Sequence, residues 1–144
     1  MLKQKRSLAR QYALQAIYQW QMTGQSVSIV EDQFLENEEL AKADVALFIA
    51  LLRGIPSNVQ DIDVALMNFV DRMIEKIDPV ERAVLRIGAY ELMRHPDIPY
   101  RVIINEAVEL AKIFGAEQSH RYVNGVLDKL ARQVRSKEIK TFSI

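Results

Sequence analysis

The 144-residue sequence contains no cysteine, which excludes disulfide bonds and thiolate-bound metal sites. Histidine is almost as scarce: His95 and His120 are isolated and do not make a zinc site without cysteine. The chain also lacks an apolar run of about 18 to 20 residues, the length that crosses a bilayer. We therefore expect no metal site and no membrane segment.

Catalytic and nucleotide-binding motifs are missing as well. The sequence has no glycine-rich phosphate loop, no nucleophile elbow and no HExxH metal motif. Glu106 and Glu109 are three residues apart on a predicted helix, with Lys112 following, which is typical of helix-surface pairing. We therefore expect no catalytic residue, no cofactor and no enzymatic activity.

The opening MLKQKRSLAR is basic but is not followed by the apolar segment of a secretory signal. Together with the absence of cysteine, this favours a cytoplasmic protein.

The formal net charge is zero, but the charges are unevenly distributed. Residues 1–12 carry four basic side chains and no acid, whereas residues 31–44 carry six acids and one lysine. Residues 121–140 are basic again, with six bases against two acids. Charged side chains often only cover solvated faces. The alternative is that the basic ends of the chain form an anion-binding patch.

Apolar residues recur at three- and four-residue spacing along nearly the whole chain, which predicts an all-α fold. The short connections favour a compact bundle of about seven helices. The expected helices cover residues 5–22, 28–37, a stretch from about 44, 59–76, 78–95, 99–115 with a left-handed cap at Gly115, and 119–135.

Asp78-Pro79-Val80-Glu81 is the clearest helix start in the sequence. It combines a capping aspartate, a proline at the first helical position and a glutamate that can complete a capping box. We place a hinge here between two small helical lobes, at about 1–77 and 78–136. The basic tail, residues 137–144, is expected to fray.

The first predicted helix, RSLARQYALQAIYQW, presents two different faces. At about 100° per residue, Ala9, Ala13, Ala16 and Trp20 share one face, which we expect to be the core. Arg6, Arg10, Leu14 and Tyr18 form a second, drifting row that could hold phosphates and stack a base. The alternative is that Leu14 and Tyr18 pack under a neighbouring helix.

The segments ERAVLRIGAYEL (81–92) and IPYRVIINEAVELAKIFGAEQSHRYVNGVLDKLAR (98–132) resemble the NusB family of transcription antitermination proteins. RSLARQYALQAIYQWQ is similar to that family's first helix, and DQFL (32–35) fits its second. The resemblance covers nearly the whole chain. It implies a single NusB-like domain over residues 1–144, with an all-helical fold of two small bundles.

The resemblance also implies a function. A member of this family is expected to bind boxA-type single-stranded RNA in nascent ribosomal RNA transcripts, together with NusE, a small-subunit ribosomal protein. The pair acts with NusA, NusG and RNA polymerase to suppress premature termination. The alternative is a helical interaction scaffold or homodimer in which the partner makes the RNA contacts.

The family's RNA-contacting positions correspond to ten residues of this sequence. They are Lys3, Lys5, Arg6, Arg10, Tyr18, Glu81, Phe114, Gln118, Arg121 and Tyr122. The family's basic run is more continuous than this one, and it often has an acid where Gln118 stands. Asn124 and Gly125 match the family's NG pair, and we expect Gly125 to allow close helix packing. Weaker candidates for the NusE contact are Phe69, Glu75 and Arg86.

Overall fold

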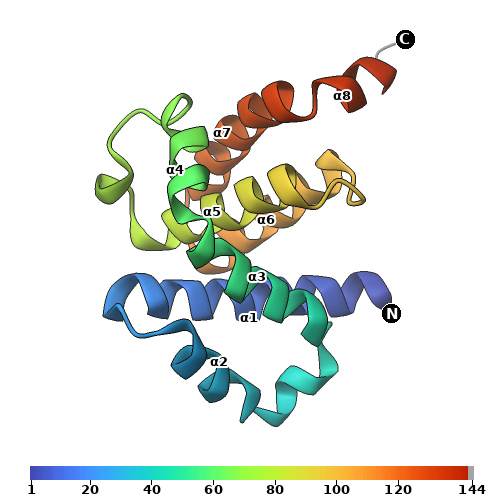
Figure 1. The fold of residues 1–144 in the computed structure, drawn as a ribbon. Helices are drawn as coiled ribbons and strands as arrows, with labels where there is room; N and C mark the ends of the chain where they lie inside the picture. Colours follow the sequence, from blue (N-terminus) through green and yellow to red (C-terminus); the bar gives the residue numbers. More distant parts are fainter. Residues whose placement is uncertain (143–144) are drawn as a thin grey trace. The chain divides into compact units, whose positions relative to one another are not determined.

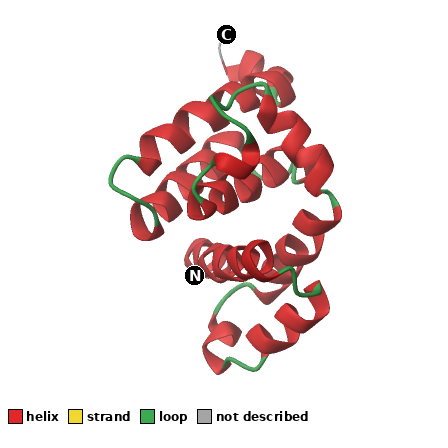
Figure 2. Ribbon diagram, turned by 90° about the vertical axis from the view of Figure 1, so that its left-hand side faces the viewer, coloured by secondary structure: helices red, strands yellow, loops and turns green. Residues whose placement is uncertain are grey.

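A computed structural model describes residues 1–142, which form helices joined by short loops and contain no β-strand (Figure 1, Figure 2). This confirms the predicted all-α class. The α-helices of this range are α1 (Leu2–Thr23), α2 (Val27–Leu35), α3 (Val45–Ser57), α4 (Val59–Met67), α5 (Pro79–Arg94), α6 (Tyr100–Phe114), α7 (Ser119–Val134) and α8 (Ser136–Phe142). Two 3₁₀ turns, η1 (Glu38–Lys42) and η2 (Ile74–Lys76), lie between them.

The chain divides into two compact units, Met1–Val59 and Gln60–Ile144. This division differs from the boundary expected at Asp78, because residues 60–77 group with the C-terminal helices. Within the second unit, an ion pair joins α4 to α5. Arg86 donates from Nε and Nη2 to the two carboxylate oxygens of Asp63, at 3.0 and 2.8 Å.

In the first unit, α1 packs against α3 and α2. The face of α1 that carries Ala9, Ala13 and Ala16 is fully buried, as predicted. These side chains are small, which lets neighbouring helices approach α1 closely. On α3, Phe48 and Leu51 are fully buried as well.

Helix α1 ends at Gly24, as predicted, with the glycine in the left-handed region at φ 69°. Its N–H donates to the carbonyl of Trp20 at 3.0 Å. Trp20 itself is half-buried, so the expectation that it belongs to the core is wrong. The residues that follow it, from Met22 to Gly24, are exposed, and solvent therefore reaches the last turn of α1.

In the second unit, α5, α6 and α7 pack against one another. The start of α5 follows the prediction: Pro79 is its first residue, and Asp78 accepts from the N–H groups of Val80 and Glu81 at 3.1 and 3.2 Å. The side chain of Leu127 on α7 occupies the space beside Gly88 on α5. A Cβ at that glycine would stand 2.5 Å from Cδ1 of Leu127.

Helix α4 is shorter than predicted. It ends at Met67, so Phe69 lies in a loop instead of on a helix face. The loop leads to η2, where Ile74 is buried, and Ile77 is buried directly after it. Leaving the helix lets the chain bury these two side chains before α5 begins.

Gly115 does not adopt the left-handed conformation that we expected. Its backbone is extended, with φ −93° and ψ 177°. Space explains the glycine instead, since a Cβ would stand 2.8 Å from the carbonyl oxygen of Ala111 and 2.9 Å from Cβ of Ser119. The turn between α6 and α7 is therefore too tight for a side chain at this position.

The segment after Arg135 forms α8, although it was expected to fray; residues 143 and 144 of the predicted tail lie outside the described residues. Arg135 is 7% exposed and donates to the carbonyls of Leu92 at 2.8 Å and His95 at 2.8 Å. It also pairs with Glu138 Oε1 at 2.6 Å. Glu138 Oε2 in turn accepts from the N–H of Tyr100 at 2.9 Å. One buried guanidinium thus connects α8 to the end of α5.

No single helix within residues 1–142 has the length and apolar composition to cross a membrane. Only α3 and α4 taken together reach that length, and a bend separates them.

Replacing Arg135 by methionine removes the donor for several buried carbonyls and the partner of Glu138. We expect Arg135→Met to lower the free energy of unfolding by about 3 kcal/mol. Arg132→Met is the matched control, since Arg132 is an exposed side chain that pairs with Asp128 at 3.1 Å. That variant should change the free energy of unfolding by less than about 1 kcal/mol. Urea denaturation followed by circular dichroism measures both, and equal values for the two variants would contradict the anchoring role.

Candidate nucleic-acid interface

The predicted RNA-contacting residues divide between the two units. In the first unit, the five candidates all lie on α1: Lys3, Lys5, Arg6, Arg10 and Tyr18. In the second unit, they surround the start of α5 and the turn between α6 and α7: Glu81, Phe114, Gln118, Arg121 and Tyr122.

On α1, some of the residues that we expected to face outward are exposed and others are buried. Lys3 and Lys5 are exposed, and Tyr18 is 39% exposed. The aromatic ring of Tyr18 therefore reaches solvent, as the row predicted. Leu14 is 2% exposed, so it belongs to the core and not to the presented face.

Arg10 is buried, at 2% exposure, so the expectation that its guanidinium stands on an open face is wrong. The spacing explains this. Arg10 precedes Ala13, Leu14 and Ile17 at three, four and seven residues, which is one continuous buried stripe. The four-residue row that groups it with Tyr18 drifts by about 40° at each step.

Arg6 is intermediate between these two extremes. Its side chain is 39% exposed, and its Nε lies 3.7 Å from Asp44 Oδ2. Asp44 also caps α3 by accepting from the N–H of Leu47 at 3.0 Å. The guanidinium of Arg6 is therefore partly neutralised but still reaches solvent.

In the second unit, Tyr122 belongs to a cluster that the sequence did not reveal. Its hydroxyl donates to Asp71 Oδ1 at 3.0 Å. Arg72 donates to both carboxylate oxygens of Asp71, from Nε at 2.8 Å and from Nη2 at 3.0 Å. The guanidinium carbon of Arg72 lies 5.6 Å from the centre of the Tyr122 ring, within the range of a cation–π interaction.

These contacts set the charges of the cluster. The hydrogen bonds from Arg72 and then from Tyr122 lower the pKa of the Asp71 carboxyl to about 2. Burial raises the pKa of the Tyr122 phenol, and its hydrogen bond to Asp71 raises it further. Near neutral pH, Asp71 is therefore an anion and Tyr122 is a neutral donor, so the ring is held in one orientation beside a cation.

Glu81 lies close enough to this cluster to act on it electrostatically. The hydrogen bond to Asp71 is the main cause of the raised pKa of Arg72, and the negative charge of Glu81 raises this pKa further. The structure thus brings together Glu81 and Tyr122, which the resemblance singled out, and adds Asp71 and Arg72. The sequence placed these two residues inside a helix, where an adjacent Asp-Arg pair indicates only a solvated surface.

The remaining candidates surround the turn between α6 and α7. Phe114, the last residue of α6, is 36% exposed, and Gln118 and Arg121 are exposed as well. The tight turn at Gly115 therefore presents an aromatic ring, an amide and a cation within a few residues of Tyr122.

The weaker partner-binding candidates are not equally accessible. Glu75 is exposed and Phe69 is half-buried. The side chain of Arg86 is only 11% exposed, because Asp63 holds it in the ion pair between α4 and α5. Arg86 therefore has a structural role in the second unit, and the expectation that it faces a partner is not supported by its position.

No group of three or more His, Cys, Asp and Glu side chains within the described part of the chain could hold a metal ion.

Comparison with known proteins identifies the family. Residues 7–132 match the NusB family. The chain is 53% identical to the Transcription antitermination protein NusB of Alcanivorax borkumensis over 133 residues, which cover 92% of this chain and 89% of the relative. It is 51% identical to the protein of the same name from Nitrosococcus oceani, over 97% of this chain and 94% of the relative.

A solved structure of T. maritima NusB has a similar fold, with a TM-score of 0.75 and 31% sequence identity. The match covers 88% of this chain and 90% of that one. Together with the sequence matches, it shows that this chain belongs to the NusB family of transcription antitermination proteins.

Proposed function

We propose that this chain acts in antitermination by binding boxA-type single-stranded RNA of nascent ribosomal transcripts, together with NusE. The observation that carries the proposal is that the same elements present both aromatic rings and cations. Tyr18 lies on a helix that presents Lys3 and Lys5, and Tyr122 lies under Arg72. Single-stranded RNA is typically bound by stacking its bases on such rings while cations contact its phosphates.

Each group has a distinct part in this proposal. Tyr18 and Phe114 offer ring faces to unstacked bases, and Lys3, Lys5 and Arg121 contact phosphates. Glu81 is a carboxylate that can accept from the amino group of a cytosine or guanine, which would add base preference. Arg10 is excluded from direct contact because it is buried.

The Asp71–Arg72–Tyr122 cluster supports the same function through preorganisation. An exposed ion pair between neighbouring residues contributes little to stability. A phosphate can therefore take the place of Asp71 on Arg72 at a small cost in free energy. The hydrogen bond from the Tyr122 hydroxyl to Asp71 still holds the ring. We infer that Arg72 is an additional phosphate contact beside Tyr122.

NusE is expected to strengthen RNA binding. The formal net charge of the chain is zero, so its own long-range attraction for RNA is weak. A partner that extends the RNA-binding surface increases affinity, and RNA then increases the affinity for the partner by the same factor. The loop and 3₁₀ turn between α4 and α5, with Phe69 and Glu75, are the proposed contact. NusA, NusG and RNA polymerase would join the resulting complex.

Removing the ring of Tyr18 should weaken boxA binding without unfolding the protein. We expect Tyr18→Ala to lower the affinity about tenfold, since stacking contributes about 1–3 kcal/mol per base. Met22→Ala is the control, because Met22 is 54% exposed on the same helix but has no aromatic ring. Fluorescence anisotropy with labelled boxA RNA measures both variants, without NusE.

Two outcomes of that titration would overturn the proposal. One is an unchanged affinity in Tyr18→Ala. The other is an isolated chain that binds no RNA until NusE is added, which would favour an interaction scaffold whose partner makes the RNA contacts.

The charge arrangement around Tyr122 can be tested directly by titration. Asp71→Asn keeps an acceptor for the phenol but removes the negative charge, so the pKa of Tyr122 should fall. Burial is the larger cause of the raised pKa, so the value should stay above that of a free tyrosine. NMR of tyrosine labelled with ¹³C at Cζ follows the titration, with the unmodified protein as the reference. An unchanged Tyr122 titration in Asp71→Asn would show that the cluster does not form in solution.

A further inference from the structure

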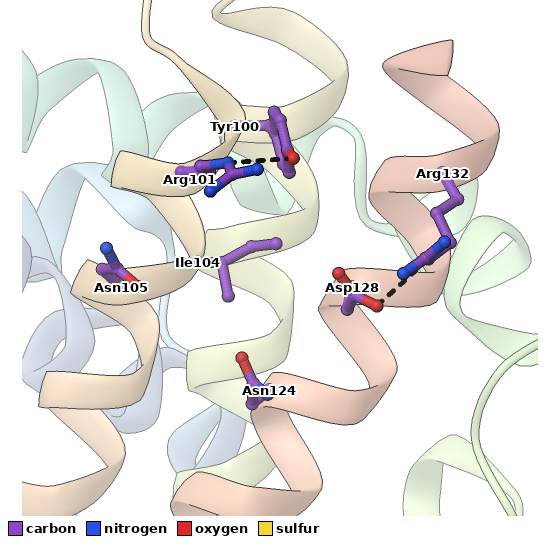
Figure 3. A pocket seen from close by; sticks show the side chains of 7 residues that line it. All are labelled: Tyr100, Arg101, Ile104, Asn105, Asn124, Asp128 and Arg132. Atoms are coloured by element: carbon purple, nitrogen blue, oxygen red, sulfur yellow. Dashed lines mark hydrogen bonds and ion pairs between the residues drawn. The ribbon is translucent and has the colours of Figure 1, made fainter. Parts of the chain in front are cut away.

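The second unit contains an open groove between α6 and α7 that is not part of the candidate RNA interface. Its volume is about 330 Å³, and its lining is mostly polar (Figure 3). The lining residues are Tyr100, Arg101, Ile104, Asn105, Asn124, Asp128 and Arg132. They come from the first half of α6 and from α7 between Asn124 and Arg132, whereas Phe114 to Tyr122 surround the turn that joins the two helices.

Two asparagine side chains stand on opposite walls of the groove. Figure 3 shows Asn105 on α6 and Asn124 on α7, with Ile104 between them. Ile104 is 6% exposed and forms an apolar floor, while both asparagines are exposed. Neither asparagine side chain makes a hydrogen bond to another residue in the described part of the chain. Each carboxamide therefore offers a donor and an acceptor, which is the complement of a peptide unit.

The groove also holds a cation that no carboxylate neutralises within residues 1–142. Arg101 donates from Nε to the hydroxyl of Tyr100 at 3.1 Å, and its guanidinium carbon lies 5.6 Å from that ring centre. Both of these contacts are to an uncharged residue. Asp128, the one acid of the lining, pairs with Arg132 at 3.1 Å. Arg101 is therefore available to an external anionic group.

Gly125 supplies an independent observation. We expected it to allow close helix packing, but it is exposed, and a Cβ there would meet no atom within 4 Å. Glycine makes a helix less stable than alanine does, and no contact within residues 1–142 requires glycine at this position. It adjoins Asn124 and lies three residues before Asp128, on the exposed strip of α7. Its missing side chain leaves the helix backbone open to a closely approaching chain.

We propose that this groove binds an extended segment of a partner protein through an acidic side chain and its main chain. The carboxylate contacts Arg101, the two asparagines pair with peptide groups, and the segment passes over Gly125. RNA fits the groove less well, because the Tyr100 ring is only 8% exposed and cannot stack a base. The inference does not depend on the proposed boxA function.

Side-chain NMR tests this site directly, because the carboxamides of Asn105 and Asn124 and the Nε–H of Arg101 each give a ¹H–¹⁵N signal. The probes are the capped pentapeptides Ac-AAEAA-NH₂ and Ac-AAQAA-NH₂ and a five-nucleotide boxA RNA, each titrated to millimolar concentration. We expect the glutamate peptide to shift all three side-chain signals. The glutamine peptide should bind several-fold more weakly, and the RNA should leave these signals in place.

Two variants make the result specific. Arg101→Gln should remove the preference for the glutamate peptide. Gly125→Gln should lower the affinity for that peptide several-fold, because the added side chain covers the helix backbone. The variant should still fold, since a Cβ at this position meets no other atom. Lys42→Gln is the control, since Lys42 is an exposed cation of the first unit, and this variant should bind the peptide normally. The proposal is overturned if neither peptide shifts these signals, if glutamate and glutamine peptides bind equally, or if RNA shifts them instead.

Discussion

The side chains that each helix buries fix the rotation of that helix about its own axis. This rotation decides which residues of the protein can contact a ligand. On α1, the buried alanines and the stripe from Arg10 to Ile17 fix that rotation, and Lys3, Lys5 and Tyr18 are exposed as a consequence. On α7, the buried residues Val123, Val126, Leu127 and Leu130 do the same. Tyr122 and Asn124 are then placed on its accessible side. The two units thus use one principle to present polar and aromatic groups on rigid elements.

Hydrogen bonds and ion pairs then orient the side chains that helix packing has placed on the surface. The carboxylate of Asp71 holds both the phenol of Tyr122 and the guanidinium of Arg72, so a ring and a cation are oriented before any ligand arrives. Binding to a side chain that is already oriented costs less conformational entropy than binding to one that must first be ordered. Arg135 shows the same chemistry in a buried setting, where a guanidinium satisfies main-chain carbonyls and stabilises the fold.

Much of the fold could be predicted from the sequence, because capping chemistry is local. Asp78-Pro79 and Gly24 mark helix ends through contacts within a few residues, and both predictions are confirmed. The errors concern residues whose environment depends on distant parts of the chain. Arg10 is buried although it lies in a basic segment, and Gly125 lacks the close packing expected of it. The Asp71–Tyr122 contact joins residues 51 positions apart, so no local pattern could reveal it.

The central claim is that the exposed rings of Tyr18 on α1 and of Phe114 at the turn between α6 and α7 bind single-stranded RNA directly, with the half-buried Tyr122 beside a phosphate contact. Titrating boxA RNA into protein labelled on its tyrosine and phenylalanine rings, and following the ring signals by NMR, tests this claim most directly. The account predicts saturable upfield shifts of the Tyr18 and Phe114 rings, since stacked bases shield the protons beneath them. It also predicts a saturable shift of the Tyr122 ring as a phosphate contacts Arg72. Saturable binding that leaves these three rings unshifted would contradict it.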